Sequence, residues 1–200
     1  KQAQQQGNFI QAITQLPARS SNDGSYALSL LEKARLEYLA KQYKQSQQHF
    51  SQAYQVVEKT QQAAKVQLSR GVENLSAIVS NDNAMRYDIP LYEQSMLHSY
   101  QALNYLQQKD VSGALVEIRR ANLVQLQALE KNVHVLQNIK AQAKEQSYAL
   151  DSLPSKSPDM SQVIGKLKNS FQSAYTFYLS GVIYEAAGQS NDAYSYQSQK

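Results

Sequence analysis

The stretch from Asn81 to Leu106 reads N-D-N-A-M-R-Y-D-I-P and then L-Y-E-Q-S-M-L-H-S-Y-Q-A-L-N-Y-L, and helical pattern lies on both sides of it. Its first half carries Asp82 and Asn83, which favour tight turns, and Pro90, which suits the first turn of a helix. Its second half begins a unit of helix, short turn and helix. The rest of the chain is therefore expected to be organised around this stretch as a helical array.

The composition favours helices throughout the 200 residues. Only 7 Gly and 4 Pro interrupt a sequence in which Gln, Ala, Leu and Ser dominate, and straight-chain side chains lose little freedom in a helix. Tyr (14) outnumbers Phe (4), and Trp is missing. Because tyrosine has an apolar ring and a polar tip, we expect half-wet packing surfaces between the helices of an open array. The predicted fold class is all-α.

Along the chain, residues 1–24 form an N-terminal segment with one short helix, and residues 25–200 form the helical domain. Its expected helices run from about Tyr26 to Ala40, Tyr43 to as far as Ser80, Pro90 to Gln108, Ser112 to about Tyr148, Pro158 to Leu167 and Ser173 to Ala187, with a last one from about Asn191. Two of them are unusually long. We expect the helix from Ser112 to pack against the extension that carries Val66, Leu68 and Leu75.

Three places show a helix, a short turn and a second helix with matching small and large residues. These are Ala34 with Tyr43, Ser46, Phe50 and Ala53; Ala102 and Tyr105 with Val111, Ala114, Ile118 and Ala121; and Gly181 and Tyr184 with Gly188 and Ala193. The first two units are 68 residues apart, twice the period of a tetratricopeptide repeat. The pattern resembles that repeat, although Glu37 and Gln197 stand where aromatic residues are usual and the third unit breaks the phase. The resemblance implies a tetratricopeptide-like helical-repeat array, with the two long helices packed against it as extra elements.

Longer phrases carry a closer resemblance. S-N-D-N-A-M-R-Y, Y-E-Q-S-M-L-H-S-Y-Q-A-L-N-Y-L, G-A-L-V-E-I-R-R-A-N and Y-L-S-G-V-I-Y-E-A-A-G resemble an uncharacterised family of tetratricopeptide-type lipoproteins of Gram-negative bacteria, over roughly residues 25–196. The resemblance implies a periplasmic domain, tethered to the outer membrane by a lipid on an N-terminal cysteine. No cysteine occurs in this sequence, so we expect the chain to be a piece of a longer protein.

Several classes of chemistry find no support in the sequence. Without cysteine there is no thiol nucleophile, disulfide or Cys-based zinc site, and His49, His98 and His134 lack the spacing of a metal pair. No Gly-rich phosphate loop and no G-x-S-x-G elbow occurs. We therefore expect no enzyme, and no catalytic, cofactor-binding or metal-ligating residue. The net charge is +4, and the basic residues are scattered along the sequence, which argues against nucleic-acid binding. The apolar runs are too short to span a bilayer.

The first candidate site is a partner groove. Tetratricopeptide arrays present the first helix of each pair along a concave surface, which here predicts Leu31, Arg35, Tyr38, Ser99, Leu103, Leu106, Tyr178, Val182 and Glu185. The set lacks the Lys and Asn pattern that clamps a peptide carboxylate. It is apolar enough for a helix to fill it, either a partner's helix or one of this chain, and we favour the latter.

The second candidate is the central turn, with Asp82, Asn83, Arg86, Tyr87 and Asp88. It reads as a salt-bridged structural turn, as a partner-binding loop, or as a pair of catalytic carboxylates flanking an arginine. Met85, Tyr87, Ile89 and Leu91 form an alternating apolar set, and burial of such side chains is favourable. The structural interpretation is therefore preferred.

Taken together, the sequence predicts a monomeric, non-enzymatic scaffold for protein–protein interaction in the bacterial cell envelope. Its partners would be envelope proteins, and its only membrane attachment a lipid anchor outside this chain. Two alternatives stay open. One is a peptidoglycan- or glycan-binding module, which the tyrosines would permit by stacking, and the other is a cytoplasmic helical adaptor.

Overall fold

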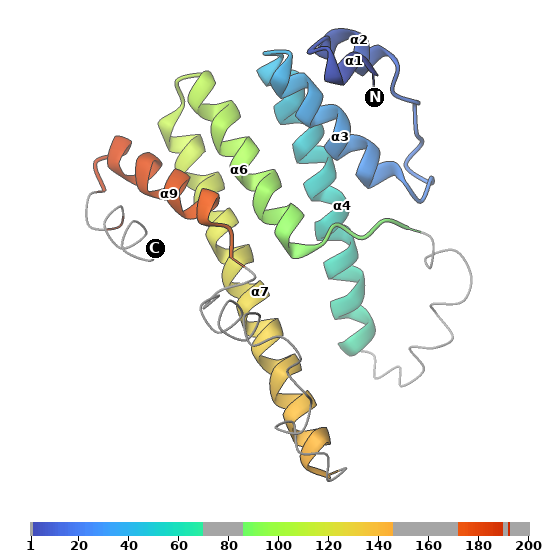
Figure 1. The fold of residues 1–200 in the computed structure, drawn as a ribbon, viewed down its shortest axis with the longest axis vertical. Coiled ribbons are helices and arrows are strands. Elements are labelled where there is room, and N and C mark those ends of the chain that lie inside the picture. Colours follow the sequence, from blue (N-terminus) through green and yellow to red (C-terminus); the bar gives the residue numbers. More distant parts are fainter. Residues whose placement is uncertain (1, 70–85, 146–171, 190–191, 193–200) are drawn as a thin grey trace, which may run out of the picture.

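The computed structural model describes residues 2–69, 86–145, 172–189 and 192. Every regular element within these ranges is an α-helix (Figure 1), which confirms the predicted class. The helices are α1 (Gln2–Gln5), α2 (Phe9–Thr14), α3 (Tyr26–Leu39), α4 (Tyr43–Ser69), α6 (Leu91–Gln107), α7 (Val111–Glu145) and α9 (Ala174–Ala186). The N-terminal segment holds two short helices in place of the single one expected. The expected helices at 70–80, at 158–167 and from 191 lie outside the described residues.

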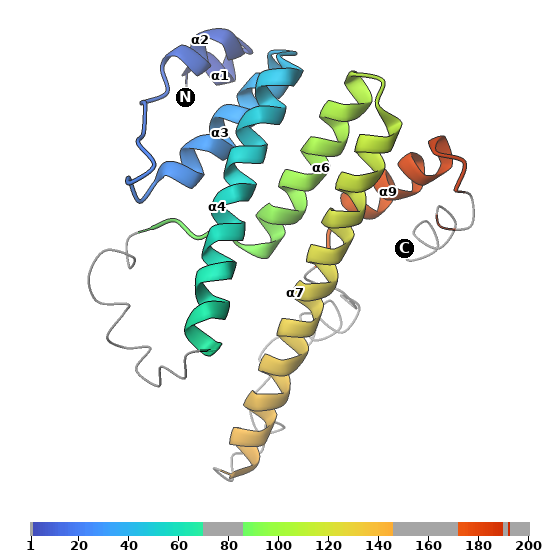
Figure 2. The same ribbon diagram turned by 180° about the vertical axis from the view of Figure 1, so that it is seen from behind.

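The described fold consists of two antiparallel hairpins, the further helix α9 and the short N-terminal helices α1 and α2. Helix α3 packs on α4, α6 packs on α7, and α9 packs across both α6 and α7. The first hairpin meets the second where α3 and α4 contact α6 (Figures 1 and 2). Helix α6 is therefore the central element, since it contacts α3, α4, α7 and α9.

Helices α3, α6 and α9 end with the same backbone geometry. Lys41, Lys109 and Gly188 occupy equivalent positions after these helices, with φ of 61°, 62° and 73°. The residue after each one donates its N–H back to a carbonyl of the preceding helix turn, at 2.8, 2.9 and 2.8 Å. A left-handed residue followed by such a bond closes a helix C-terminus. Glycine adopts this conformation freely, whereas the two lysines adopt it at a cost in energy.

The core divides into three apolar clusters. One joins α3, α4 and α6 around Phe50 and Leu97, and a second joins α6, α7 and α9 around Ile118 and Ile183. Alanines in these interfaces are fully buried, namely Ala34, Ala53, Ala102, Ala114 and Ala121. Such small side chains let the helices approach closely. The third cluster covers Leu36 with α1 and α2.

Buried polar pairs link the same helices. The Asn104 amide donates to the Ser46 hydroxyl at 2.9 Å, between α6 and α4, and the Asn122 amide donates to Ser180 at 3.0 Å, between α7 and α9. Buried polar groups are costly unless they are paired. These pairs therefore penalise any sliding of one helix along its neighbour.

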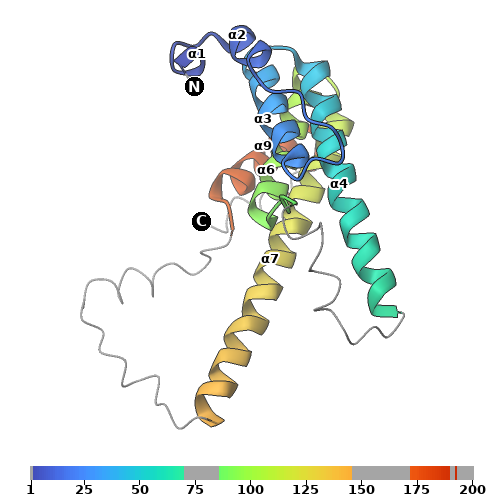
Figure 3. The same cartoon turned by 90° about the vertical axis from the view of Figure 1, so that its right-hand side faces the viewer.

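The long helices do not pair as expected. Helix α7 packs mainly on α6 and α9, and the distal halves of α4 and α7 project away from each other (Figure 3). Val66 on α4 is 47 % exposed and Leu126 on α7 is 50 % exposed. The predicted packing of α7 on the extension of α4 is wrong for the described residues, because both helices bury their proximal halves within their own hairpins. Residue 75 lies outside the description, as does the side chain at 68.

Candidate functional site

A cavity of about 410 Å³ lies between α3 and α6. Phe50 and Leu97 of the first core cluster form its floor. Its rim includes Leu28, which is 42 % exposed although it is apolar. The other lining residues are Leu31, Glu32, Arg35, Glu93, Met96 and Tyr100. The opening is thus mainly apolar, with two carboxylates and one guanidinium at its walls.

A second cavity, of about 270 Å³, adjoins the first. It is lined by Tyr38, Met96, Tyr100, Leu103 and Tyr175, from α3, α6 and α9, and it shares Met96 and Tyr100 with the first cavity. The two cavities are neighbours across the three helices, and we call them together the groove. None of the described segments fills it, since α1 and α2 pack over Leu36 instead.

Helical periodicity explains how the groove is assembled. Residues three, four or seven positions apart lie on one face of a helix. On α3 this places Leu28, Leu31 and Arg35 together, and on α6 it places Met96, Tyr100 and Leu103 together. The packing of α3 on α6 and of α6 on α9 then sets these faces side by side.

Aromatic contacts hold the groove walls in place. The Tyr38 ring meets the Tyr43 and Tyr100 rings edge to face, at centroid distances of 5.7 and 5.2 Å. The Tyr100 ring stacks on Phe50 at 5.5 Å. Burial raises the pKa of Tyr38, and the neighbouring phenols of Tyr175, Tyr43 and Tyr100 raise it further. The pKa of Tyr175 is raised by burial and then by Tyr100. These phenols therefore stay neutral at physiological pH.

Four of the nine groove residues predicted from the sequence line the groove. Leu31 and Arg35 line the first cavity, and Tyr38 and Leu103 line the second. Tyr178, Val182 and Glu185 are exposed on α9, on the same helical face as Tyr175. They line neither cavity.

Ser99 and Leu106 do not belong to the groove. Ser99 is fully buried, because α9 crosses α6 at this point and the Ser99 hydroxyl lies 3.1 Å from that of Thr176. Leu106 packs on the second core cluster. The groove face of α6 is instead the one that carries Met96 and Tyr100. Met96 and Tyr100 were not predicted from the sequence, nor were Leu28, Glu32, Glu93 and Tyr175. Most of these positions lie three, seven or ten residues before Leu31, Leu103 or Tyr178, on the same helical face.

The described part of the central turn is anchored to the fold. Ile89 is 2 % exposed within the first core cluster. The Tyr87 backbone N–H donates to the Gly24 carbonyl at 2.7 Å, and its hydroxyl donates to Glu93 Oε2 at 2.7 Å. Arg86 and Asp88 are exposed. Asp82 and Asn83 lie outside the described residues, so the proposed carboxylate pair and salt bridge that involve Asp82 are not described.

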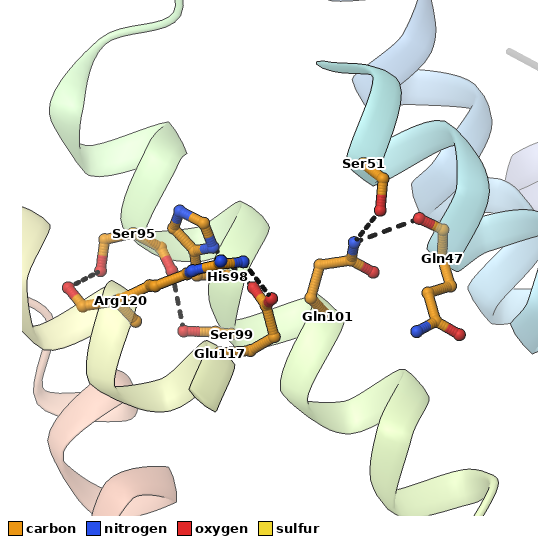
Figure 4. Close-up of polar contacts among 9 residues, drawn as sticks. Gln47, Ser51, Ser95, His98, Ser99, Gln101, Glu117 and Arg120 are labelled. Atoms are coloured by element: carbon orange, nitrogen blue, oxygen red, sulfur yellow. Dashed lines mark hydrogen bonds and ion pairs between the residues drawn. The ribbon is translucent and has the colours of Figure 1, made fainter. Parts of the chain in front are cut away.

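A polar cluster lies on the other side of α6, between α4 and α7 (Figure 4). Glu117 accepts hydrogen bonds from His98 Nδ1 at 2.7 Å and from the Arg120 guanidinium at 2.7 Å. The Tyr54 ring meets the His98 ring edge to face at 4.7 Å. Gln101 donates to the Gln47 carbonyl and to the Ser51 hydroxyl, at 3.1 and 2.9 Å.

Histidine is a common catalytic residue, so the solvent accessibility of His98 in this cluster matters. A cavity of about 220 Å³ lies beside it. However, His98 Nε2 and Gln101 Oε1 are closed off from solvent and have no hydrogen-bond partner. A molecule in the cavity therefore cannot reach the free nitrogen of the imidazole without a rearrangement. The arrangement is that of a structural pair that joins α6 to α7.

In the part of the chain that the structure describes, no three His, Cys, Asp or Glu side chains come together as a metal site would require. None of the described helices is both long and apolar enough to cross a membrane. No protein-family model, curated protein or solved structure matches this chain.

Proposed function

We propose that the protein is a non-enzymatic scaffold that binds a segment of another protein in the groove formed by α3, α6 and α9. The observation that carries this proposal is a pair of neighbouring, largely apolar cavities, of about 410 and 270 Å³, which share Met96 and Tyr100. Apolar surface that is kept open to solvent is typical of an interaction site. Grooves between helices commonly receive the apolar face of a partner helix.

We also propose that the array is built on tetratricopeptide-like repeats. The hairpins α3–α4 and α6–α7 carry buried small residues at the expected places, among them Ala34 and Ala102. Their turns repeat the left-handed residue at Lys41 and Lys109, and successive first helices contact each other. The long second helices are then part of the hairpins rather than additions to them. The periplasmic location and the lipid anchor rest on the sequence resemblance alone.

A glycan-binding module is the second candidate, and a specific observation favours it. Tyr175 and Tyr178 lie one turn apart on α9 and are 47 and 60 % exposed. Such rings can stack on sugars. The cavity beside Tyr175 offers few other polar groups, because its remaining wall consists of Met96, Leu103 and the rings of Tyr38 and Tyr100. Sugar recognition needs a larger set of hydrogen-bonding groups, so a protein segment is the better fit.

Site-specific photo-crosslinking in a cell-envelope extract tests the proposal. A photoreactive phenylalanine analogue replaces Leu28 at the groove rim, and in a matched variant it replaces Leu123, which is 58 % exposed on α7. We expect one defined protein to crosslink from position 28 and not from position 123. Equal crosslinking from both positions, or none from position 28, would refute the groove as the binding site.

A further inference from the structure

The groove carries more negative than positive charge, although the chain as a whole has a net charge of +4. Glu32 and Glu93 line the first cavity together with a single basic residue, Arg35. Among the described residues, none of these three forms an ion pair. Glu185 adds a further exposed carboxylate along α9. The groove therefore presents a net negative charge to an incoming segment.

One of these carboxylates is fixed in place. Glu93 accepts hydrogen bonds from the Tyr87 hydroxyl at 2.7 Å and from the Tyr92 hydroxyl at 3.2 Å. Both donors are neutral, so they orient the carboxylate without cancelling its charge. A held carboxylate at the wall of the first cavity favours a basic partner segment over an acidic one.

The second cavity is suited to a cation for a different reason. Three tyrosine rings, Tyr38, Tyr100 and Tyr175, line it from three helices, and none of the described residues that line it is charged. Aromatic rings attract ammonium groups through their quadrupoles. Burial raises the pKa of both Tyr38 and Tyr175, so both phenols stay neutral and their rings keep the form that attracts an ammonium group. An ammonium group therefore meets no competing positive charge among the described residues of the lining.

We infer that the groove selects a partner segment that carries a lysine, with the lysine ammonium in the cavity of Tyr38, Tyr100 and Tyr175 and neighbouring apolar side chains against Leu28 and Leu31. This inference rests on the proposed function and adds the chemistry of the partner. The unbranched stem of lysine suits the site, since its methylenes pack on Met96 and Leu103 while the charged end meets the rings.

Two synthetic helical peptides test this selection against the purified protein. Both carry the same leucine and alanine face, and they differ only in having lysine or glutamate at the flanking positions. Binding is followed by NMR with labelled tyrosine rings. We expect the lysine peptide to bind about tenfold more tightly and to shift the ring signals of Tyr38, Tyr100 and Tyr175. Tyr175→Ala should remove most of that preference, whereas Tyr175→Phe keeps the ring and retains it.

The controls separate this inference from the proposed function. Leu123→Ala on α7 should leave both affinities unchanged, and thermal melting verifies that each variant is folded. Equal affinity for the two peptides overturns the lysine selection but leaves a groove that binds apolar segments. A preference for glutamate, or no binding of either peptide, also overturns it, and crosslinking from position 28 then decides the proposed function separately. A glycan site would be favoured instead by two results together. The protein would show no preference for the lysine peptide, and a chito-oligosaccharide would displace that peptide equally well from the wild type and from Tyr175→Phe.

Discussion

Gly113, in the first turn of α7, lies directly against the ring of Tyr105 near the end of α6. A Cβ atom at position 113 would overlap three carbons of that ring. The hairpin between α6 and α7 closes tightly here because residue 113 has no side chain.

Gly113→Ala should therefore destabilise the fold, by about 1–3 kcal/mol if the ring is forced to move. The better helix propensity of alanine offsets only about 0.5–1 kcal/mol of this. Urea unfolding followed by circular dichroism measures the change. In a Tyr105→Ala background the overlap is gone, and there Gly113→Ala should be neutral or mildly stabilising. A penalty of equal size in both backgrounds would show that the contact with Tyr105 is not its cause.

Glu117→Ala should lower the free energy of unfolding by about 1–3 kcal/mol. The substitution removes the acceptor of His98 Nδ1, and His98 Nε2 already has no partner, so both ring nitrogens would be buried and unsatisfied. The matched variant is Arg120→Ala. The Arg120 side chain is 46 % exposed, and we expect its loss to cost less than about 1 kcal/mol. Equal effects of the two substitutions in urea titration would contradict a structural role for the histidine pair.

Tyr87 should contribute a pH dependence in alkali. Burial, followed by the hydrogen bond to Glu93, raises the pKa of Tyr87 to about 12 from an ordinary value of 10.0. The unfolded chain therefore loses this proton first, so the contribution to stability is complete below about pH 10 and declines as the pH rises towards 12. In Tyr87→Phe this contribution is missing. The stability difference between wild type and variant should shrink above pH 10 in urea titrations, and a constant difference would refute the assignment.

Ile89→Ala tests the role of the central turn. Ile89 is 2 % exposed, so its truncation should cost about 2–5 kcal/mol. Asp88→Ala, at the exposed neighbouring position, should change stability by less than about 0.5 kcal/mol. Thermal melting distinguishes the two variants. If Ile89→Ala melts like the wild type but no longer captures a partner, the turn is itself a binding loop.

The helices could be predicted from the sequence because their signals are local. Proline before α6, serine before α9 and the small residues of the hairpins each act within one or two turns. The distal packing of α7 could not be predicted in this way. Leu126 and Val66 look like seam residues by spacing, but the hairpins diverge, and spacing alone does not reveal that two helices separate.

The site was harder to predict for a related reason. Leu31, Arg35, Tyr38 and Leu103 follow from the periodicity of one helix at a time. The burial of Ser99 depends on where α9 crosses α6, which is a long-range property. The same holds for His49 and His98: neither has a carboxylate at helical spacing, yet each lies 2.7 Å from one on a neighbouring helix, Glu37 and Glu117.

The most direct test of the central claim uses the partner protein that crosslinks to position 28. Its affinity is measured for two variants of this chain, each of which carries one added carboxylate. Leu28→Glu places a carboxylate at the rim of the groove, where residue 28 is 42 % exposed, and Leu123→Glu places one on α7, where residue 123 is 58 % exposed. Both should melt close to the wild type, since substitutions at exposed positions are usually within about 0.5 kcal/mol. Titration calorimetry should show that Leu28→Glu weakens binding at least about tenfold, equivalent to about 1.4 kcal/mol, while Leu123→Glu binds like the wild type. Unchanged affinity of a folded Leu28→Glu variant would contradict the groove as the binding surface.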